Sequence, residues 1–294
     1  MTLEQLRIFA AVADKQHVTQ AAKELNLTQS ATSAAIAALE GRYGVKLFDR
    51  VGRGIVLTHT GRTFLAEARA VLARARDAEQ VLRDLAGLKA GKLVIAASQT
   101  VANYWLPSRL QAFNAAHPGI ELAVRIANTE HVADDVREGL ADIGFIEGDI
   151  DDAALSARRI DGDALVVVVG PQHPFAKRRT LPTDWMTMTP WILREPGSGT
   201  RAMFEVALKK RGLRLSDLTL QMELASNEAI RTAVESGVCA TAISDLVVEK
   251  SVAAKTLVRL EAELAKRAFY VLRHKERHVS KAETALLTSF AAAR

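Results

Sequence analysis

The segment from residue 18 to residue 53 constrains the fold of this 294-residue chain more than any other part. A helical spacing of apolar residues ends there at Asn26-Leu27-Thr28, a run of turn and cap formers, and a second helical pattern follows. Thr28 can cap that second helix through its side-chain oxygen, and Ile36 and Leu39 then fall on the inner face. The segment therefore predicts two short helices joined by a tight turn, an arrangement that suits the major groove of DNA.

The side chains expected to meet DNA are polar and lie on these helices or on a basic hairpin after them. Amide and hydroxyl groups near the start of a recognition helix reach base edges, and arginines on a hairpin suit phosphate or minor-groove contact. An ordinary helical hairpin is the simpler alternative, but the hairpin at residues 49–58, turning at Gly52 and Gly54, argues against it. The predicted DNA-binding residues are Thr19, Gln29, Ser30, Thr32, Ser33, Arg42, Arg50 and Arg53.

Residues 60–88 predict one long helix with an apolar seam. Its apolar residues recur in alternating steps of four and three, the spacing of a two-helix coiled coil. A single helix cannot bury such a seam, so pairing with a second copy of the chain is favoured over packing against the chain's own second domain. The seam consists of Phe64, Ala68, Val71, Ala75, Ala78, Leu82 and Leu85. Residues 87–91 are predicted to form a hinge.

From residue 92 onward, strand and helix patterns alternate. Strands are predicted at 92–97, 120–126, 142–146, 164–170, 189–193, 220–224, 238–243 and 268–273, and helices at 101–116, 130–140, 200–211 and 227–236. Such alternation predicts mostly parallel sheet flanked by helices. The strands at 164–170 and 268–273 are expected to connect two α/β units with a cleft between them.

Several predicted strands end in hydroxyl or amide residues that begin a helix at once. Strand ends of α/β units converge at a cleft, and helix starts offer unpaired N–H groups that suit small anions or carboxylates. A helix cap explains any single one of these sites more simply, whereas their convergence favours a ligand site. The predicted effector-binding residues are Ser98, Gln99, Thr100, Glu147, Arg194, Ser198, Gly199, Thr200, Ser226 and Asn227.

Composition excludes several classes of site. One cysteine permits no intrachain disulfide and no cysteine-rich metal site, and the seven histidines show no metal-ligand spacing. The sequence contains no nucleophile elbow or P-loop, so neither an enzyme nor a cofactor is expected. Residues 1–90 carry 13 Lys and Arg against 9 Asp and Glu, and the others 26 against 25. Without a signal peptide or a membrane-length apolar run, the expected location is cytoplasmic.

The order of residues resembles that of the LysR-type transcriptional regulators across essentially the whole chain. The matching motifs are F-x-x-V-A at 9–13, A-A at 21–22, L-N-L-T-Q-S-A at 25–31, L-E at 39–40, G-V-x-L-F-x-R at 44–50 and L-T-x-x-G at 57–61. The resemblance implies an α+β multidomain chain. Its parts would be a winged helix-turn-helix domain (1–59), a linker or dimerisation helix (60–90) and a two-lobed, periplasmic-binding-protein-like effector domain (91–294).

The resemblance also implies partners. These are double-stranded promoter DNA, a small-molecule or anion effector, further copies of the chain in a homodimer or homotetramer, and RNA polymerase. The sequence departs from the family on the recognition helix, where alanines replace basic or amide residues. These alanines are Ala34, Ala35, Ala37 and Ala38. We therefore expect Arg50 and Arg53, with Arg42 and Lys46, to carry more of the electrostatic DNA binding than usual.

The string R-E-P-G-S-G-T-R at 194–201 is similar to that of a branch with regulators of carbon fixation and inorganic sulfur metabolism. It implies an inorganic sulfur oxyanion or a phosphorylated or carboxylate metabolite as effector. Glu147 would repel a dianion unless it were protonated or met a donor on the ligand. The alternatives are redox sensing through Cys239, or a small-molecule-binding protein with residual enzymatic activity. A lone cysteine has no resolving partner, so a buried apolar thiol is favoured.

Overall fold

The computed structural model describes residues 1–52, 54–85, 91–262 and 264–292. The chain divides into two compact units, the first built mainly from Met1–Leu88 and the second from Lys89–Arg137 with Ala141–Arg294. Arg53 and most of the predicted hinge at 87–91 lie outside the described residues. Each unit has its own hydrophobic core and is taken separately below.

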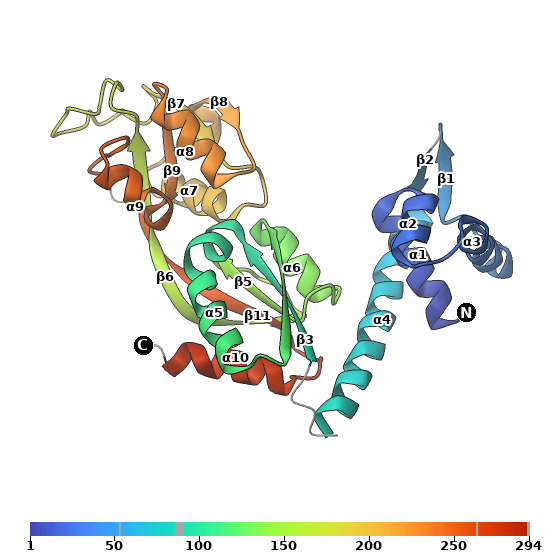
Figure 1. Ribbon diagram of the computed structural model, residues 1–294. Helices are drawn as coiled ribbons and strands as arrows, with labels where there is room; N and C mark the ends of the chain where they lie inside the picture. The colour runs from blue at the N-terminus through green and yellow to red at the C-terminus, as the bar shows by residue number, and fades with distance from the viewer. Residues whose placement is uncertain (53, 86–90, 263, 293–294) are drawn as a thin grey trace. The chain divides into compact units, whose positions relative to one another are not determined.

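The first unit is a small helical core with a two-stranded wing (Figure 1). Its helices are α1 (Leu3–Lys15), α2 (Val18–Glu24), α3 (Gln29–Tyr43) and α4 (His59–Leu85), and its strands are β1 (Phe48–Val51) and β2 (Gly54–Leu57). The predicted cap at Thr28 is confirmed, because its Oγ1 accepts a hydrogen bond from the Ala31 amide at 3.1 Å. The helix-turn-helix and the wing are therefore formed as the sequence predicts.

Glu40 joins the wing to α3. Its carboxylate accepts hydrogen bonds from the amides of Leu47, at 2.7 Å, and Phe48, at 3.2 Å, at the entry to β1. At the exit from β2, a Cβ on Gly61 would lie 2.1 Å from the Leu47 carbonyl oxygen, so only glycine fits there. The L-E and L-T-x-x-G motifs thus have structural roles, and they fix the wing beside α3.

The two ends of the predicted seam on α4 have different surroundings. Phe64 packs on Phe9 with ring centroids 4.9 Å apart, and Ala68 is buried in the core of the same unit. Further along, Leu82 and Leu85 are 68% and 79% exposed. The prediction that the whole seam faces a partner is therefore wrong for its first two positions, which complete the core of the first unit.

The second unit contains two lobes joined by a pair of long strands (Figure 1). Lobe 1 holds β3 (Gly91–Ser98), β4 (Ile120–Ala127) and β5 (Ile143–Glu147), and lobe 2 holds β7 (Pro190–Leu193), β8 (Thr219–Glu223) and β9 (Ala240–Ser244). Strands β3, β4 and β5 are parallel, as are β7, β8 and β9. Strands β6 (Leu155–Val169) and β11 (Ala265–His274) pair antiparallel and run from one lobe to the other.

Helices cover both lobes. Lobe 1 carries a π-helical turn (Val101–Trp105), α5 (Leu106–Ala116), α6 (Thr129–Arg137) and α10 (Lys281–Ala292). Lobe 2 carries α7 (Gly199–Lys209), a 3-10 turn (Leu215–Asp217), α8 (Asn227–Glu235), α9 (Asp245–Ala253) and the short strand β10 (Val258–Arg259) on the edge of β6. The sheet order β4-β3-β5-β11-β6-β9-β7-β8 places the connecting pair in the middle.

Two kinds of boundary differ from the sequence prediction. The connecting strands are longer than 164–170 and 268–273, because they begin before the apolar runs, in residues that are still paired between β6 and β11. The helix predicted at 101–116 starts with a π-helical turn, and the one predicted at 130–140 ends at Arg137. The missed strand residues matter most, because they include charged residues of the candidate site.

Candidate functional site

Strand ends and helix starts from both lobes meet beside the connecting strands. Lobe 1 contributes Ser98 to Thr100 after β3 and Glu147 at the end of β5, and lobe 2 contributes the first residues of α7 and α8. Ser98, Thr100, Thr200 and Asn227 are buried, as is the Glu147 side chain. The structure therefore brings together residues that lie more than 120 positions apart in the sequence.

Arg267 of β11 lies at the centre of this cluster, although the sequence analysis did not select it. Its side chain is fully buried and donates to the Thr200 hydroxyl at 2.9 Å and to the Thr100 hydroxyl at 3.5 Å. Two further bonds hold it to the carboxylate of Asp163 on β6, one of them Nη2 to Oδ2 at 2.6 Å. Burial alone would lower the pKa of the Arg267 guanidinium. The hydrogen bond to Asp163 and the negative charges of Glu147, Asp163 and Asp245 outweigh that effect and raise the pKa.

Glu147 is satisfied by hydroxyl groups. Its carboxylate accepts hydrogen bonds from Ser98 and, at 3.4 Å, from Thr200, and it lies 3.8 Å from the nearest guanidinium nitrogen of Arg267. Two of these neighbours belong to lobe 1 or the connecting strands, and Thr200 belongs to lobe 2. Glu147 is therefore in contact with both sides of the cleft.

A second set of contacts across the cleft is centred on Asn227. Its side chain donates to the Thr100 hydroxyl at 3.2 Å, and its backbone amide donates to the Gln99 side chain at 3.0 Å. Gln99 in turn donates to the Ala225 carbonyl at 2.5 Å. The start of α8 is thus attached to the end of β3 by amide and hydroxyl groups that a polar ligand can also engage.

The glycines around Ser198 serve close packing between the lobes. A Cβ on Gly199 would lie 2.5 Å from the Glu147 carbonyl oxygen, and the Gly199 amide donates to the Thr129 hydroxyl at 3.2 Å. Gly197 has a φ of +82°, and a Cβ there would lie 2.5 Å from the Glu130 carboxylate. The backbone of this loop therefore lies directly against lobe 1.

Some predicted effector-binding residues have the simpler role of a cap or an ion pair. Ser198 accepts from the Arg201 amide at 3.5 Å and Ser226 from the Ala229 amide at 3.2 Å, so both cap helices. Arg194 is buried and binds Glu195 through two hydrogen bonds, at 2.8 and 2.9 Å, while also donating to Asn227. Its charge is compensated within the protein.

The residues that the sequence analysis missed are Asp163, Arg267, Thr129 and Ser244. Ser244 donates a hydrogen bond to Asp163, and Thr129 connects the ends of β4 and β5 with α7. A signal was present, because Asp163 and Arg267 are the charged residues directly before each apolar connecting run. The predicted strands begin at the first apolar residue of each run, so they leave out Asp163 and Arg267.

The predicted DNA-binding residues differ in their exposure to solvent. Gln29, Ser30 and Ser33 are exposed on the first turns of α3, whereas Thr32 is buried and donates to the Thr28 carbonyl at 3.0 Å. Thr32 is therefore a core residue, and its inclusion among the predicted DNA-binding residues is not supported by its burial. Thr19 is half-buried, and Arg42 and Arg50 are exposed. Arg53 lies outside the described residues.

Cys239 is a buried thiol. Its Sγ lies 3.1 Å from the Gln221 side-chain oxygen, and burial raises the pKa of the thiol. A raised pKa lowers the fraction of thiolate, the form that reacts with oxidants. The geometry therefore gives no support to redox sensing through this residue.

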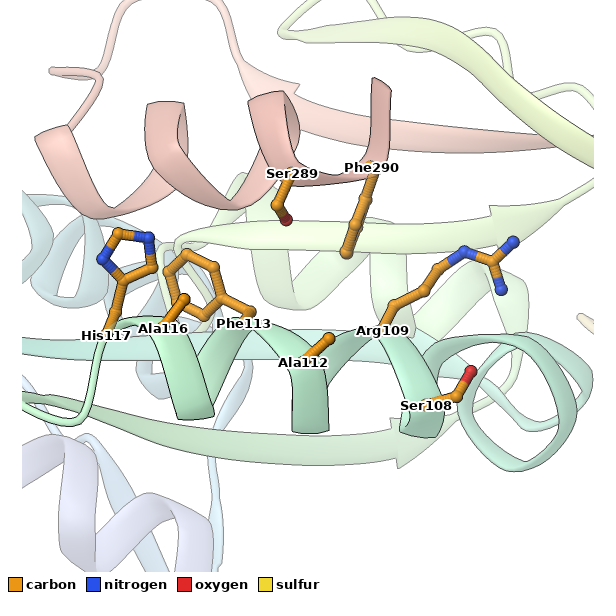
Figure 2. A pocket seen from close by; sticks show the side chains of 8 residues that line it. All are labelled: Ser108, Arg109, Ala112, Phe113, Ala116, His117, Ser289 and Phe290. Atoms are coloured by element: carbon orange, nitrogen blue, oxygen red, sulfur yellow. The ribbon is translucent and has the colours of Figure 1, made fainter. Parts of the chain in front are cut away.

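A separate hollow of about 370 Å³ lies on lobe 1 between α5 and α10. Figure 2 shows Phe113 and His117, from the end of α5, facing Ser289 and Phe290 of α10. It runs along α5 from Ser108 to His117 and contains none of the predicted effector-binding residues. Its lining is mainly apolar, unlike that of the interlobe cluster.

Among the described residues, no group of His, Cys, Asp and Glu side chains could hold a metal ion. Among the same residues, no helix is long and apolar enough to cross a membrane.

Comparison with known proteins identifies the family. Residues 3–62 match the bacterial regulatory helix-turn-helix protein model of the lysR family, and residues 86–294 match the LysR substrate binding domain. The chain belongs to the LysR family. LysR proteins of this kind are DNA-binding transcription regulators and not enzymes.

Among curated LysR relatives, the transcriptional regulator YeiE of Escherichia coli K12 is 36% identical over 284 residues, covering 96% of this chain and 94% of YeiE. The RuBisCO operon transcriptional regulator of Allochromatium vinosum is 33% identical over 263 residues, covering 90% of this chain and 86% of that protein. Full-length LysR-type relatives therefore share the complete arrangement of DNA-binding unit and effector domain.

Solved LysR structures agree with the fold. Full-length CbnR in complex with its target DNA superposes with a TM-score of 0.69 at 20% identity, and the match covers 100% of both chains. The regulatory domain of Synechocystis CcmR in complex with 2-PG gives a TM-score of 0.63 at 25% identity, covering 69% of this chain and 97% of that one. The CcmR structure contains the regulatory domain, so this comparison concerns the two-lobed domain.

Proposed function

We propose that this LysR regulator binds a small oxyanion, or a phosphorylated or carboxylate metabolite, between its two lobes, and that the ligand modulates promoter binding. The observation that carries the proposal is the buried cluster of hydroxyls around Arg267, to which both lobes contribute. Hydroxyls and a guanidinium are donors that suit oxyanions. The complex of the similar CcmR domain with 2-PG supports a small metabolite as ligand.

The proposed mechanism is a population shift. A ligand that takes over hydrogen bonds now made between lobes, such as that from Thr200 to Glu147, changes the relative stability of lobe arrangements. The ligand shifts the equilibrium only by its difference in affinity for the two arrangements. We propose that the shift alters contacts between copies of the chain in a dimer or tetramer, and through them the spacing of paired recognition helices.

A thermal-shift screen of the full-length protein tests the ligand class. The compounds are sulfite, sulfate, thiosulfate, phosphate, sugar phosphates and small carboxylates, and a true effector should raise the unfolding temperature because it binds the folded state. Thr200→Val removes the hydroxyl between Glu147 and Arg267 and should abolish the shift. Thr219→Val, at an exposed position on β8, is the matched control. An equal shift in Thr200→Val would disprove the assignment of the cleft.

The dependence of DNA affinity on salt concentration tests the proposed DNA-binding surface. We propose that Arg50, exposed on the wing, contacts a phosphate, so Arg50→Ala should reduce the slope of log affinity against log salt by about one. Lys210→Ala, at an exposed position at the end of α7, is the control and should leave the slope unchanged. An unchanged slope in Arg50→Ala would exclude Arg50 from phosphate contact.

A further inference from the structure

Two buried carboxylates share one guanidinium in the interlobe cleft. Asp163 binds Arg267 through two hydrogen bonds, one of them 2.6 Å long, whereas Glu147 lies 3.8 Å from the nearest guanidinium nitrogen. Asp245 adds a further negative charge near Arg267. The positive charge of Arg267 is therefore balanced mainly by Asp163, and Glu147 adds negative charge to the cluster.

The other arginines beside the cleft have carboxylate partners of their own. Arg194 is bound by Glu195 through two hydrogen bonds. Arg201 pairs with Glu205 at 3.0 Å and also with Glu223. A fully deprotonated dianion entering this place would meet no surplus of positive charge, and it would lie beside Glu147.

The remaining groups of the cleft are well suited to an anion that carries a proton. Hydroxyl groups can donate or accept, whereas the Glu147 carboxylate serves as an acceptor for Ser98 and Thr200. Resting on the proposed function above, we infer that the cleft selects oxyanions bearing an O–H group over fully deprotonated oxyanions. The ligand O–H donates to Glu147, and its other oxygens accept from Thr100, Thr200 and Arg267.

Ser98 explains why this selection is sharp. Its hydroxyl donates to Glu147, so it still holds the carboxylate in place when the Thr200 hydroxyl donates to the ligand instead. An anion without a proton brings a lone pair against that fixed acceptor, which leaves two acceptors facing each other without a hydrogen atom between them. A protonated oxyanion replaces this repulsion with a charge-assisted hydrogen bond.

Inorganic phosphate and sulfate provide the test, because both are tetrahedral oxyanions of similar size, and at neutral pH phosphate retains a proton and sulfate does not. Isothermal titration of the full-length protein should show phosphate binding at least about tenfold more tightly than sulfate. In Glu147→Gln the side-chain amide can donate to sulfate, so the preference should vanish or reverse. Glu121→Gln, which alters an exposed carboxylate paired with Lys92 on the outer strands, should keep the wild-type preference.

The outcomes separate the two proposals. Equal binding of phosphate and sulfate to the wild type overturns the inference and leaves the oxyanion-binding function standing, as does an unchanged preference in a folded Glu147→Gln protein. Binding of neither anion overturns the proposed oxyanion site and this inference with it. The wild-type preference needs no variant, so the inference can be refuted even if Glu147→Gln does not fold.

Discussion

At the scale of single residues, the pair Asp163 and Arg267 holds the connecting strands together from the inside. Both side chains are fully buried, and Ser244 gives Asp163 an additional hydrogen bond. Breaking a buried pair by removing one partner costs more than the pair itself contributes, because the other charge stays buried. The pair therefore contributes to the stability of the second unit whether or not a ligand binds.

We expect Arg267→Met to lower the free energy of unfolding of this unit by about 3–5 kcal/mol, since it leaves Asp163 charged and buried without a cation. Adding Asp163→Asn should recover much of the loss, because a neutral amide can still accept from Ser244. Tryptophan fluorescence during urea unfolding measures the effect, as all three tryptophans lie beyond residue 100. A loss below about 1 kcal/mol in Arg267→Met would contradict the argument.

His173 gives the second unit a dependence on pH. Its ring is buried, with one nitrogen 2.7 Å from the Thr189 hydroxyl and the other accepting from the Phe175 amide, and burial lowers its pKa from the ordinary 6.5. The unfolded chain then takes up the proton first, so the stabilisation is complete above pH 6.5 and is lost as the pH falls through the folded pKa.

The expected result is a free energy of unfolding that decreases from pH 7.5 toward pH 5 in the wild type, with a shallower slope in His173→Gln. Fluorescence-monitored urea unfolding at several pH values measures it. His59→Gln, an exposed position in the first unit, serves as control. The same slope in His173→Gln as in the wild type would assign the pH dependence to other groups.

At the scale of elements, the helices of the DNA-binding unit differ in how they begin. Thr28 caps α3, whereas His17 stands at the cap position of α2, in extended backbone, without a side-chain hydrogen bond. His17→Ser should stabilise α2 and Thr28→Ala should destabilise α3, each by about 0.5–2 kcal/mol. Hydrogen exchange of the full-length protein, resolved by peptide, measures both. Faster exchange of α2 in His17→Ser would contradict this account.

Sequence periodicity was sufficient to predict most helices and strands, but not the contacts that decide their roles. Phe64 and Ala68 follow the coiled-coil spacing, yet they pack into the core of their own unit, and spacing alone cannot name the partner of an apolar face. Asp163 and Arg267 were missed because a charged residue in a strand is acceptable only once its partner across the sheet is known. The predicted cleft residues did gather, since strand ends follow from chain order.

At the scale of the whole molecule, the exposed end of α4 is the surface on which we propose that two chains pair. Leu82→Ser together with Leu85→Ser should shift the protein toward monomers in sedimentation velocity. Loss of the second DNA contact should weaken binding to a two-site DNA by more than about tenfold, with a smaller effect on a single half-site. Gln80→Ser, on another face of α4, is the control. A dimer that survives the double change would place the pairing surface elsewhere.

Strand β11 also determines when the effector domain can be completed during synthesis. It lies between β5 and β6 in the middle of the sheet, yet among the described residues it is the last strand to be made, and α10 follows it. The DNA-binding unit, whose helices and strands lie within the first 85 residues, leaves the ribosome long before β11 can pair with β5 of lobe 1. A chain whose synthesis stops before Ala265 would therefore keep the complete DNA-binding unit and lack a connecting strand of the effector domain.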